Sequence, residues 1–196
     1  KPVYGAAGSG MHVNISLFRG LENAFYDPET PLNISDLARF FVGGLIEHAS
    51  AITAIANPLI NSYKRLVSGF EAPVYITWSG PNRSSLIRIP SGRGLSTRLE
   101  FRSPDTSCNH YLTFAVVLAA GLDGIKRGID PGDPVDLNVY HLTAAERKSL
   151  GIQTLPSNLK EALDHLEGDK VIREALGEHV YENVMRLGML EWEEYN

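Results

Sequence analysis

The sequence predicts an α+β fold, in which an antiparallel sheet packs against helices and is followed by a helical C-terminal tail. Alternating apolar and polar residues indicate strands at residues 11–17, 74–79, 85–90 and 96–102, and no helix separates the last three. Apolar residues at helical spacing indicate helices between the first two strands and in the last third. With 196 residues, of which 43% are hydrophobic and 21% charged, the chain can bury a substantial core.

The N-terminal stretch combines a loop of small residues with a strand. From Tyr4 to Gly10 the backbone can approach a ligand closely, although the Gly-Lys-Ser/Thr ending of a phosphate loop is missing. In the strand that follows, His12, Asn14 and Ser16 share the face opposite the apolar residues. This polar row is a candidate ligand face, and a purely structural histidine is the alternative for His12.

Two helices and a long loop come next. Ser35 is a suitable N-cap for the first helix. The second, over residues 49–56, ends where Pro58 disfavours helical geometry in the residue before it. Residues 57–73 lack regular periodicity but hold several large apolar side chains, which indicates a packed lid rather than a solvated surface loop.

The last predicted strand places Leu99 and Phe101 on one face and Arg98, Glu100 and Arg102 on the other. Two interpretations of the charged face are open. It can be a solvated ladder of ion pairs, worth at most about 1 kcal/mol. It can also be one wall of an active site, in which the carboxylate holds a cation and the arginines hold an anion.

Charge and composition narrow the possible functions. The net charge of −5 argues against a general nucleic-acid binder. Residues 61–102 nevertheless contain seven Lys and Arg but two Glu, and such a basic island favours a local anion such as phosphate or carboxylate. The apolar stretches are too short or too interrupted to predict a membrane span. The single Cys108 fits a reducing cytoplasm and a buried, inert thiol.

The remaining elements read as scaffold. Residues 108–126 are apolar almost all round, as expected of a buried helix. The turn-rich residues 130–134 predict a division into a catalytic core at 1–130 and a mainly helical C-terminal subdomain at 131–196. Apolar stripes predict three further helices, near residues 159–166, 171–177 and 180–187.

Four motifs follow one another between residues 8 and 102. They are GSGMHVNISL at 8–17, NPLINSYKRLVSGFEAP at 57–73, NRS at 82–84 with IRIP at 87–90, and RLEFR at 98–102. In this order they resemble the C-terminal catalytic portion of the glutamine synthetase family. The resemblance extends over essentially the whole chain, and four ordered motifs are far more specific than a lone glycine loop.

The resemblance implies ATP-dependent amidation of glutamate by ammonia through a γ-glutamyl phosphate, with Mg²⁺ or Mn²⁺ at the site. It implies that His12 and Glu100 ligate a metal. It also implies ATP-binding roles for Ser16, Arg83 and Arg98, substrate-binding roles for Gly8, Arg65, Arg88 and Arg102, and catalytic roles for Glu71, Arg83 and Arg102.

Three positions need separate comment. The resemblance places Glu71 on a flap that excludes water from the acyl phosphate and deprotonates the incoming ammonium or its adduct, whereas the alternative is a plain surface carboxylate. Asn14 stands where many bacterial members carry a second histidine. Tyr140 matches a tyrosine that some bacterial members adenylylate, but its flanks resemble the subclass without this control, so we expect a structural tyrosine.

The resemblance also predicts what these residues lack. The family's N-terminal β-grasp domain, and the acidic strand residues that complete its metal sites, are not among the 196 residues, so we expect the chain alone to be inactive. The implied assembly is a cytoplasmic homo-oligomer, a dodecamer with active sites between subunits. A ligase of the same fold that joins glutamate to an amine or polyamine, and a non-catalytic assembly module, are the alternatives.

Overall fold

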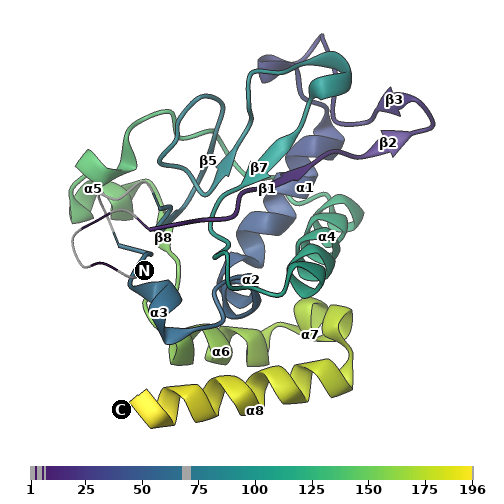
Figure 1. Ribbon diagram of the computed structural model, residues 1–196. Coiled ribbons are helices and arrows are strands. Elements are labelled where there is room, and N and C mark those ends of the chain that lie inside the picture. The colour runs from purple at the N-terminus through teal and green to yellow at the C-terminus, as the bar shows by residue number, and fades with distance from the viewer. Residues whose placement is uncertain (1–2, 4–5, 7, 68–71, 196) are drawn as a thin grey trace.

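A four-stranded sheet lies at the centre of the computed structural model, which describes residues 3, 6, 8–67 and 72–195 (Figure 1). In spatial order its strands are β1 (Val13–Ile15), β7 (Leu99–Phe101), β6 (Ile87–Arg88) and β5 (Trp78–Ser79). Two small sheets pair β2 (Phe18–Arg19) with β3 (Glu22–Asn23) and β4 (Tyr75–Ile76) with β8 (Gln153–Thr154). Together with the helices, these strands confirm the predicted α+β class.

Some helices pack beside the sheet, and the C-terminal helices build the lower layer in Figure 1. They are α1 (Asp36–Glu47), α2 (Ala49–Ala56), α3 (Ile60–Tyr63), α4 (His110–Arg127), α5 (Ala144–Ser149), α6 (Leu159–Gly168), α7 (Lys170–Leu176) and α8 (Glu178–Tyr195). Short 3-10 turns span Pro31–Asn33, Gly94–Ser96 and Val139–His141. The predicted cap is confirmed, because Ser35 Oγ accepts a hydrogen bond from the amide of Ala38 at 3.2 Å.

The pairing of β7 with both of its neighbours sets the polar row of the sheet. Glu100 lies directly opposite Asn14 of β1 and opposite Arg88 of β6. Residues that face one another across neighbouring strands point to the same side, so these three side chains share one face. Leu99 and Phe101 point to the other face and are fully buried in the core.

One strand pairing differs from the antiparallel sheet that the sequence predicts. β5 and β6 are parallel, with Trp78 opposite Ile87, and β4 pairs with β8. The connection between β5 and β6 is not a tight hairpin, because Asn82 Nδ2 donates hydrogen bonds to the carbonyls of Val135 and Leu137 at 3.2 and 2.5 Å. These contacts draw the loop toward a distant segment, and the chain re-enters the sheet in the direction in which it left.

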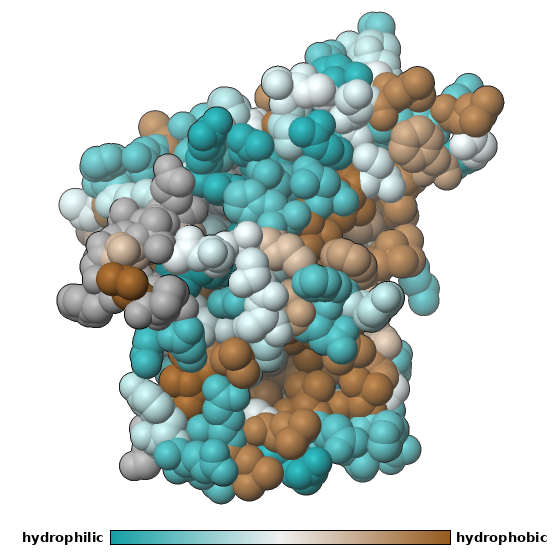
Figure 2. Space-filling model, viewed as in Figure 1, coloured by the Kyte–Doolittle hydropathy of each residue, from teal (hydrophilic) through white to brown (hydrophobic). Residues whose placement is uncertain are grey.

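Helix α4 is only partly buried, which corrects the prediction of a helix enclosed on all sides. One side packs against α1, and Val116 and Ala120 are fully buried there. The opposite side exposes large apolar side chains, namely Tyr111, Phe114, Leu118 and Leu122. Brown apolar surface is visible around this helix in Figure 2. Apolar composition predicted burial on every side, but the described residues cover one side of this helix only.

The C-terminal helices correspond to the three that the sequence predicts after residue 158. α6 packs against α2 and α8, while α7 packs against α4. Because β8 pairs with β4, segments from both sides of residue 130 share one small sheet; the division at that residue stays a prediction. Among the helices that the structure describes, none has the length and apolarity that a bilayer crossing requires.

A buried histidine ties these layers together. His48, at the junction of α1 and α2, has its Nδ1 2.6 Å from Asp169 Oδ2 and its Nε2 3.1 Å from Asp123 Oδ2. Ionised carboxylates only accept hydrogen bonds, so two of them beside one ring favour the imidazolium, in which both ring nitrogens donate. Burial lowers the pKa of His48, but hydrogen bonds to the two aspartates, with their charges, outweigh it and raise the pKa above 6.5.

We expect His48→Gln to destabilise the protein more at mildly acidic than at alkaline pH. With a raised folded-state pKa, the stabilisation is complete below about pH 6.5 and is lost as the pH rises through the higher folded value. Urea titrations at about pH 6 and about pH 9 should therefore give a larger difference between wild type and variant at the lower pH. An equal difference in the free energy of unfolding at both pH values, or a larger difference at alkaline pH, would contradict this expectation. His165→Gln, on the exposed side of α6, is the control.

Candidate active site

Glu100 occupies the centre of the polar face of the sheet, and only 7% of the residue is exposed. Its Oε1 lies 3.1 Å from Nδ1 of His12. Its Oε2 lies 2.6 Å from Nε of Arg88 and 3.6 Å from Nε of Arg102. One carboxylate thus faces a histidine and two guanidiniums, which come from three neighbouring strand segments.

Arg98 does not take part in this cluster. Its Nε donates a hydrogen bond to Oδ1 of Asn14 at 3.0 Å, and its NH1 donates to the carbonyl of Ser96 at 3.3 Å. Ser16 lies nearby, and its hydroxyl donates to the carbonyl of Thr97 at 2.8 Å. The structure therefore brings together two predicted ATP-binding residues, Arg98 and Ser16, at the far end of β7.

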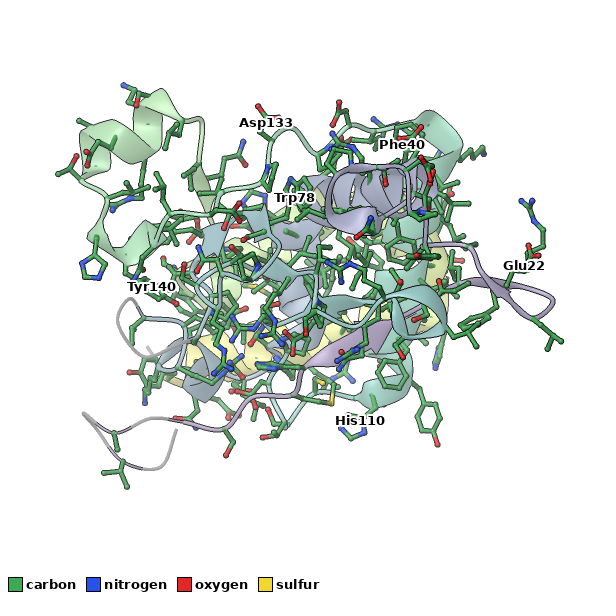
Figure 3. The ribbon with its side chains drawn as sticks, turned by 90° about the horizontal axis from the view of Figure 1, so that it is seen from above. Glu22, Phe40, Trp78, His110, Asp133 and Tyr140 are labelled. Atoms are coloured by element: carbon green, nitrogen blue, oxygen red, sulfur yellow. The ribbon has the colours of Figure 1, made fainter. Side chains whose placement is uncertain are left out.

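This face does carry ion pairs between neighbouring strands, but they are buried rather than solvated. Glu100 and Arg102 are buried, and the nearest cation to Glu100 is Arg88 of a neighbouring strand rather than Arg98 of its own. Buried charges are retained where they are paired and hydrogen-bonded. In the view of Figure 3, blue nitrogen atoms gather in the middle of the molecule, between the labelled Tyr140 and His110.

Arg102 connects the cluster to the loop that carries Arg83. Its NH1 donates hydrogen bonds to the backbone carbonyl of Arg83 and to that of Ser85, the latter at 3.3 Å. The side chain of Arg83 is exposed. The structure therefore ties Arg83 to the cluster through its backbone, which leaves its guanidinium accessible to a ligand.

Arg65 forms a second buried cation beside the cluster, with 6% of the residue exposed. Its NH2 donates hydrogen bonds to Asn57 Oδ1 at 3.1 Å and to the carbonyl of Ser103. Its Nε lies 3.9 Å from Asp105 Oδ2. Burial lowers the pKa of Arg65, and the charge of Asp105 opposes this shift.

The glycine loop lies directly against Arg65. A Cβ at Gly8 would lie 3.4 Å from Cγ of Arg65, and a Cβ at Gly10 would lie 2.9 Å from its NH1. A side chain at position 10 would therefore require the guanidinium of Arg65 to shift. The small residues of this loop therefore let it pack closely against a cation, in addition to any approach of the backbone to a ligand.

Sequence reasoning missed Asn57, Asp105 and Gly10 as partners of Arg65. Asn57 is eight positions before Arg65 in the chain, and Asp105 is forty positions after it. No periodicity of a helix or strand relates such positions. The available signal was weak: a polar residue before Pro58 in an otherwise apolar segment.

The sequence also carried expectations for Glu71 and Tyr140. Glu71 lies outside the described residues, so its flap role stays a prediction. Tyr140 is half-buried, and its hydroxyl donates to the carbonyl of Ala72 at 2.7 Å, while its ring lies 6.2 Å from that of Tyr75. These contacts give Tyr140 a structural role at the end of the 57–73 loop.

His12 and Glu100 fit the requirements of metal ligands, although they do not complete a site. Burial and the charge of Arg102 lower the pKa of His12, in opposition to Glu100. The imidazole is then neutral at pH 7, and a hydrogen on Nδ1 facing the carboxylate leaves the Nε2 lone pair available. Within the described part of the chain, no three His, Cys, Asp or Glu side chains converge as a metal centre would require.

The comparisons with known proteins all indicate the same family. The family model for the glutamine synthetase catalytic domain matches residues 1–196. Glutamine synthetase of Thermotoga maritima is 58% identical over 196 residues, and that of Methanosarcina mazei is 55% identical over 195. Both alignments cover the whole of this chain. They cover only 45% of the Thermotoga maritima protein and 44% of the Methanosarcina mazei protein, so the chain spans less than half the length of the curated proteins it matches.

Solved structures agree with the sequence relatives. The chain described as "Apo GmaS without ligand" superposes with a TM-score of 0.87 at 39% identity, over 100% of this chain and 44% of that one. A second solved chain, described as "GmaS/ADP complex-Conformation 1", superposes with a TM-score of 0.83 at 38% identity. That superposition covers 96% of this chain and 43% of the other. A family model that covers every residue, together with relatives above 50% identity and the same fold, places this chain in the glutamine synthetase catalytic-domain family.

Proposed function

We propose that this chain supplies one wall of the active site of a glutamate–ammonia ligase, which forms glutamine from glutamate, ammonia and ATP through a γ-glutamyl phosphate. The observation that carries the proposal is the convergence of Glu100 with His12, Arg88 and Arg102 on one face of the sheet, in a chain of this family. The ADP complex of the similar protein GmaS supports the use of ATP.

A divalent cation, Mg²⁺ or Mn²⁺, is part of this proposal. Glu100 and neutral His12 would contribute a carboxylate oxygen and an imidazole nitrogen, a donor set that both ions accept and that favours Mn²⁺ slightly. When bound, the metal would neutralise charge on the transferring phosphoryl group. Further ligands must come from outside the described residues, because these two do not complete a coordination sphere.

The arginines would divide the anionic parts of the substrates between them. Arg83 and Arg102 would face the transferring phosphoryl group, whose equatorial oxygens need preorganised cations, and Arg98 would bind the ATP phosphates beside Ser16. Because Arg102 is held by two backbone carbonyls, its position needs little reorganisation when charge develops.

The amino-acid substrate would lie on the other side of Arg102. Arg65, with Gly8 beside it, would bind the carboxylate of glutamate, since a guanidinium offers planar bidentate pairing, and Arg88 and Arg102 would contribute charge. Glu71 would exclude water and accept a proton from ammonium when the loop closes.

The remaining features are proposed on the family's pattern. The active protein would be a cytoplasmic homo-oligomer, and the buried thiol of Cys108, whose pKa is raised by burial, is consistent with a reducing compartment. The alternative acceptor is an amine or polyamine, which a ligase of the same fold would join to glutamate.

The test is a chimera in which this chain replaces the matching segment of the Thermotoga maritima enzyme. We expect the chimera to form glutamine and ADP in equal amounts when it is given glutamate, ATP, Mn²⁺ and ammonium, and the 196-residue chain alone to form no detectable glutamine. Activity with primary amines or polyamines but not with ammonium would identify the amine ligase. A folded chimera that consumes no ATP would contradict the proposal.

A further inference from the structure

The guanidinium of Arg65 is held by neutral acceptors. Its NH2 donates to the side-chain carbonyl of Asn57 at 3.1 Å and to the backbone carbonyl of Ser103. The carboxylate of Asp105 stays 3.9 Å from Nε, beyond hydrogen-bond distance, and Nε is buried without a hydrogen-bond partner. Two neutral oxygens orient the NH2 group and add no charge, so the longer ion pair with Asp105 is not joined by a second carboxylate at this point.

Both neutral acceptors are fixed to rigid parts of the fold. Asn57 is fully buried at the C-terminus of α2, where its backbone N–H donates a hydrogen bond to the backbone carbonyl of Thr53 at 2.8 Å. The segment after β7 is joined to the same point, because the amide of Asp105 donates to the carbonyl of Ala56 at 2.8 Å. Asn57 therefore stands where α2 meets the exit of the sheet, and Arg65 bridges them.

The third side of the guanidinium faces the glycine loop. A Cβ at Gly10 would lie 2.9 Å from NH1, so this nitrogen points at the backbone of residues 8–10. With NH2 engaged by Asn57 and NH1 directed at the loop, the side chain has little freedom to rotate. The orientation of Arg65 thus depends on Asn57, a residue to which the family resemblance assigned no role.

We propose that Asn57 is a positioning residue for Arg65, which it holds through a neutral carbonyl, without adding a second carboxylate to that of Asp105, so that the cation stays available to the carboxylate of the amino-acid substrate. This inference rests on the proposed role of Arg65. The proposal makes two requirements of the side chain at position 57: it must accept a hydrogen bond from Arg65, and it must carry no charge. Two substitutions test these requirements separately.

Asn57→Leu keeps the size of the side chain but removes the acceptor, whereas Asn57→Asp keeps both shape and acceptor but adds a charge. In the chimera we expect either change to raise the KM for glutamate by about tenfold, with the KM for ATP within about twofold of wild type. Asn57→Leu would release the guanidinium of Arg65, whereas Asn57→Asp would neutralise its charge. Asn183→Leu is the matched control, since Asn183 Oδ1 accepts a hydrogen bond from Arg186 at 3.2 Å on the exposed surface of α8.

A second readout uses the 196-residue chain and needs no activity. Rotation about the Nε–Cζ bond of Arg65 can be followed by nuclear magnetic resonance of its guanidinium nitrogens. We expect restricted rotation in wild type and Asn57→Asp and faster rotation in Asn57→Leu. If Asn57→Leu fails to fold, Asn57→Asp still tests the charge requirement.

The outcomes distinguish this inference from the proposed function. If the chimera forms no glutamine but the rotation follows this pattern, the proposed function is wrong and the positioning of Arg65 stands. If the chimera is active and the variants leave both the KM for glutamate and the rotation unchanged, the positioning role is wrong. Equal increases in the KM for glutamate and for ATP would indicate general damage and would also overturn it.

Discussion

Replacing Glu100 with Gln is expected to lower glutamine formation by the chimera by on the order of 10³-fold and to destabilise it by about 3 kcal/mol. The substitution keeps the shape of the side chain but removes its charge. Arg88 at 2.6 Å and Arg102 at 3.6 Å then lose the carboxylate that compensates them, and the new amide group places a donor against donors. The cation ligand proposed at this position is lost at the same time.

Three measurements separate these effects. Turnover reports the catalytic loss, electron paramagnetic resonance of Mn²⁺ reports the metal affinity, and urea titration reports the free energy of unfolding. Glu22→Gln is the matched control, because Glu22 is an exposed strand carboxylate on the projecting β2–β3 hairpin, at the edge of the view in Figure 3. Unchanged Mn²⁺ affinity and turnover in Glu100→Gln would remove Glu100 from the proposed site.

Gly44→Ala is expected to destabilise the fold by about 3 kcal/mol or more, even though alanine is the better helix former. A Cβ at Gly44 of α1 would lie 2.0 Å from the carbonyl oxygen of Ala120 in α4. The approach is reciprocal, because a Cβ at Gly124 would lie 2.5 Å from the amide nitrogen of Gly44. The two helices cross with their backbones in contact, so one methyl group must push them apart.

The measurement is the midpoint of urea unfolding followed by circular dichroism. Gly168→Ala at the end of α6 is the control, since a Cβ there would meet no atom within 4 Å. We expect the control to unfold at or slightly above the wild-type midpoint. A wild-type midpoint for Gly44→Ala would mean that the helices are farther apart than the structure shows.

Much of the fold could be predicted from local patterns. Ser35 caps α1 as expected, α2 ends at Asn57 before Pro58, and three helices follow residue 158. These features depend on residues within a few positions of one another, so the spacing of side chains along the chain is sufficient evidence. The alternation of apolar and charged residues around Glu100 could be predicted for the same reason, because it depends on the two-residue period of a strand.

Partners of the charged residues could not be predicted in the same way. The alternation of residues 98–102 placed Glu100 on one face with Arg98 and Arg102, and the ion pair with Arg102 is present. The nearer cation is Arg88, which the register of β6 and β7 brings opposite Glu100. The parallel pairing of β5 with β6 and the exposed side of α4 also depend on segments far apart in the chain. Asn57 acquires its role only because α2 ends beside the loop that carries Arg65.

The sequence by itself determined the class of the fold, the polar face of the central sheet and, through four ordered motifs, the family. It did so because side-chain periodicity and motif spacing are properties of the chain before it folds. Only the tertiary structure decided which charges meet and which atoms orient them. Glu100 faces Arg88 and His12, and Arg65 is held by Asn57, because strand register and helix packing bring together residues separated by up to 88 positions.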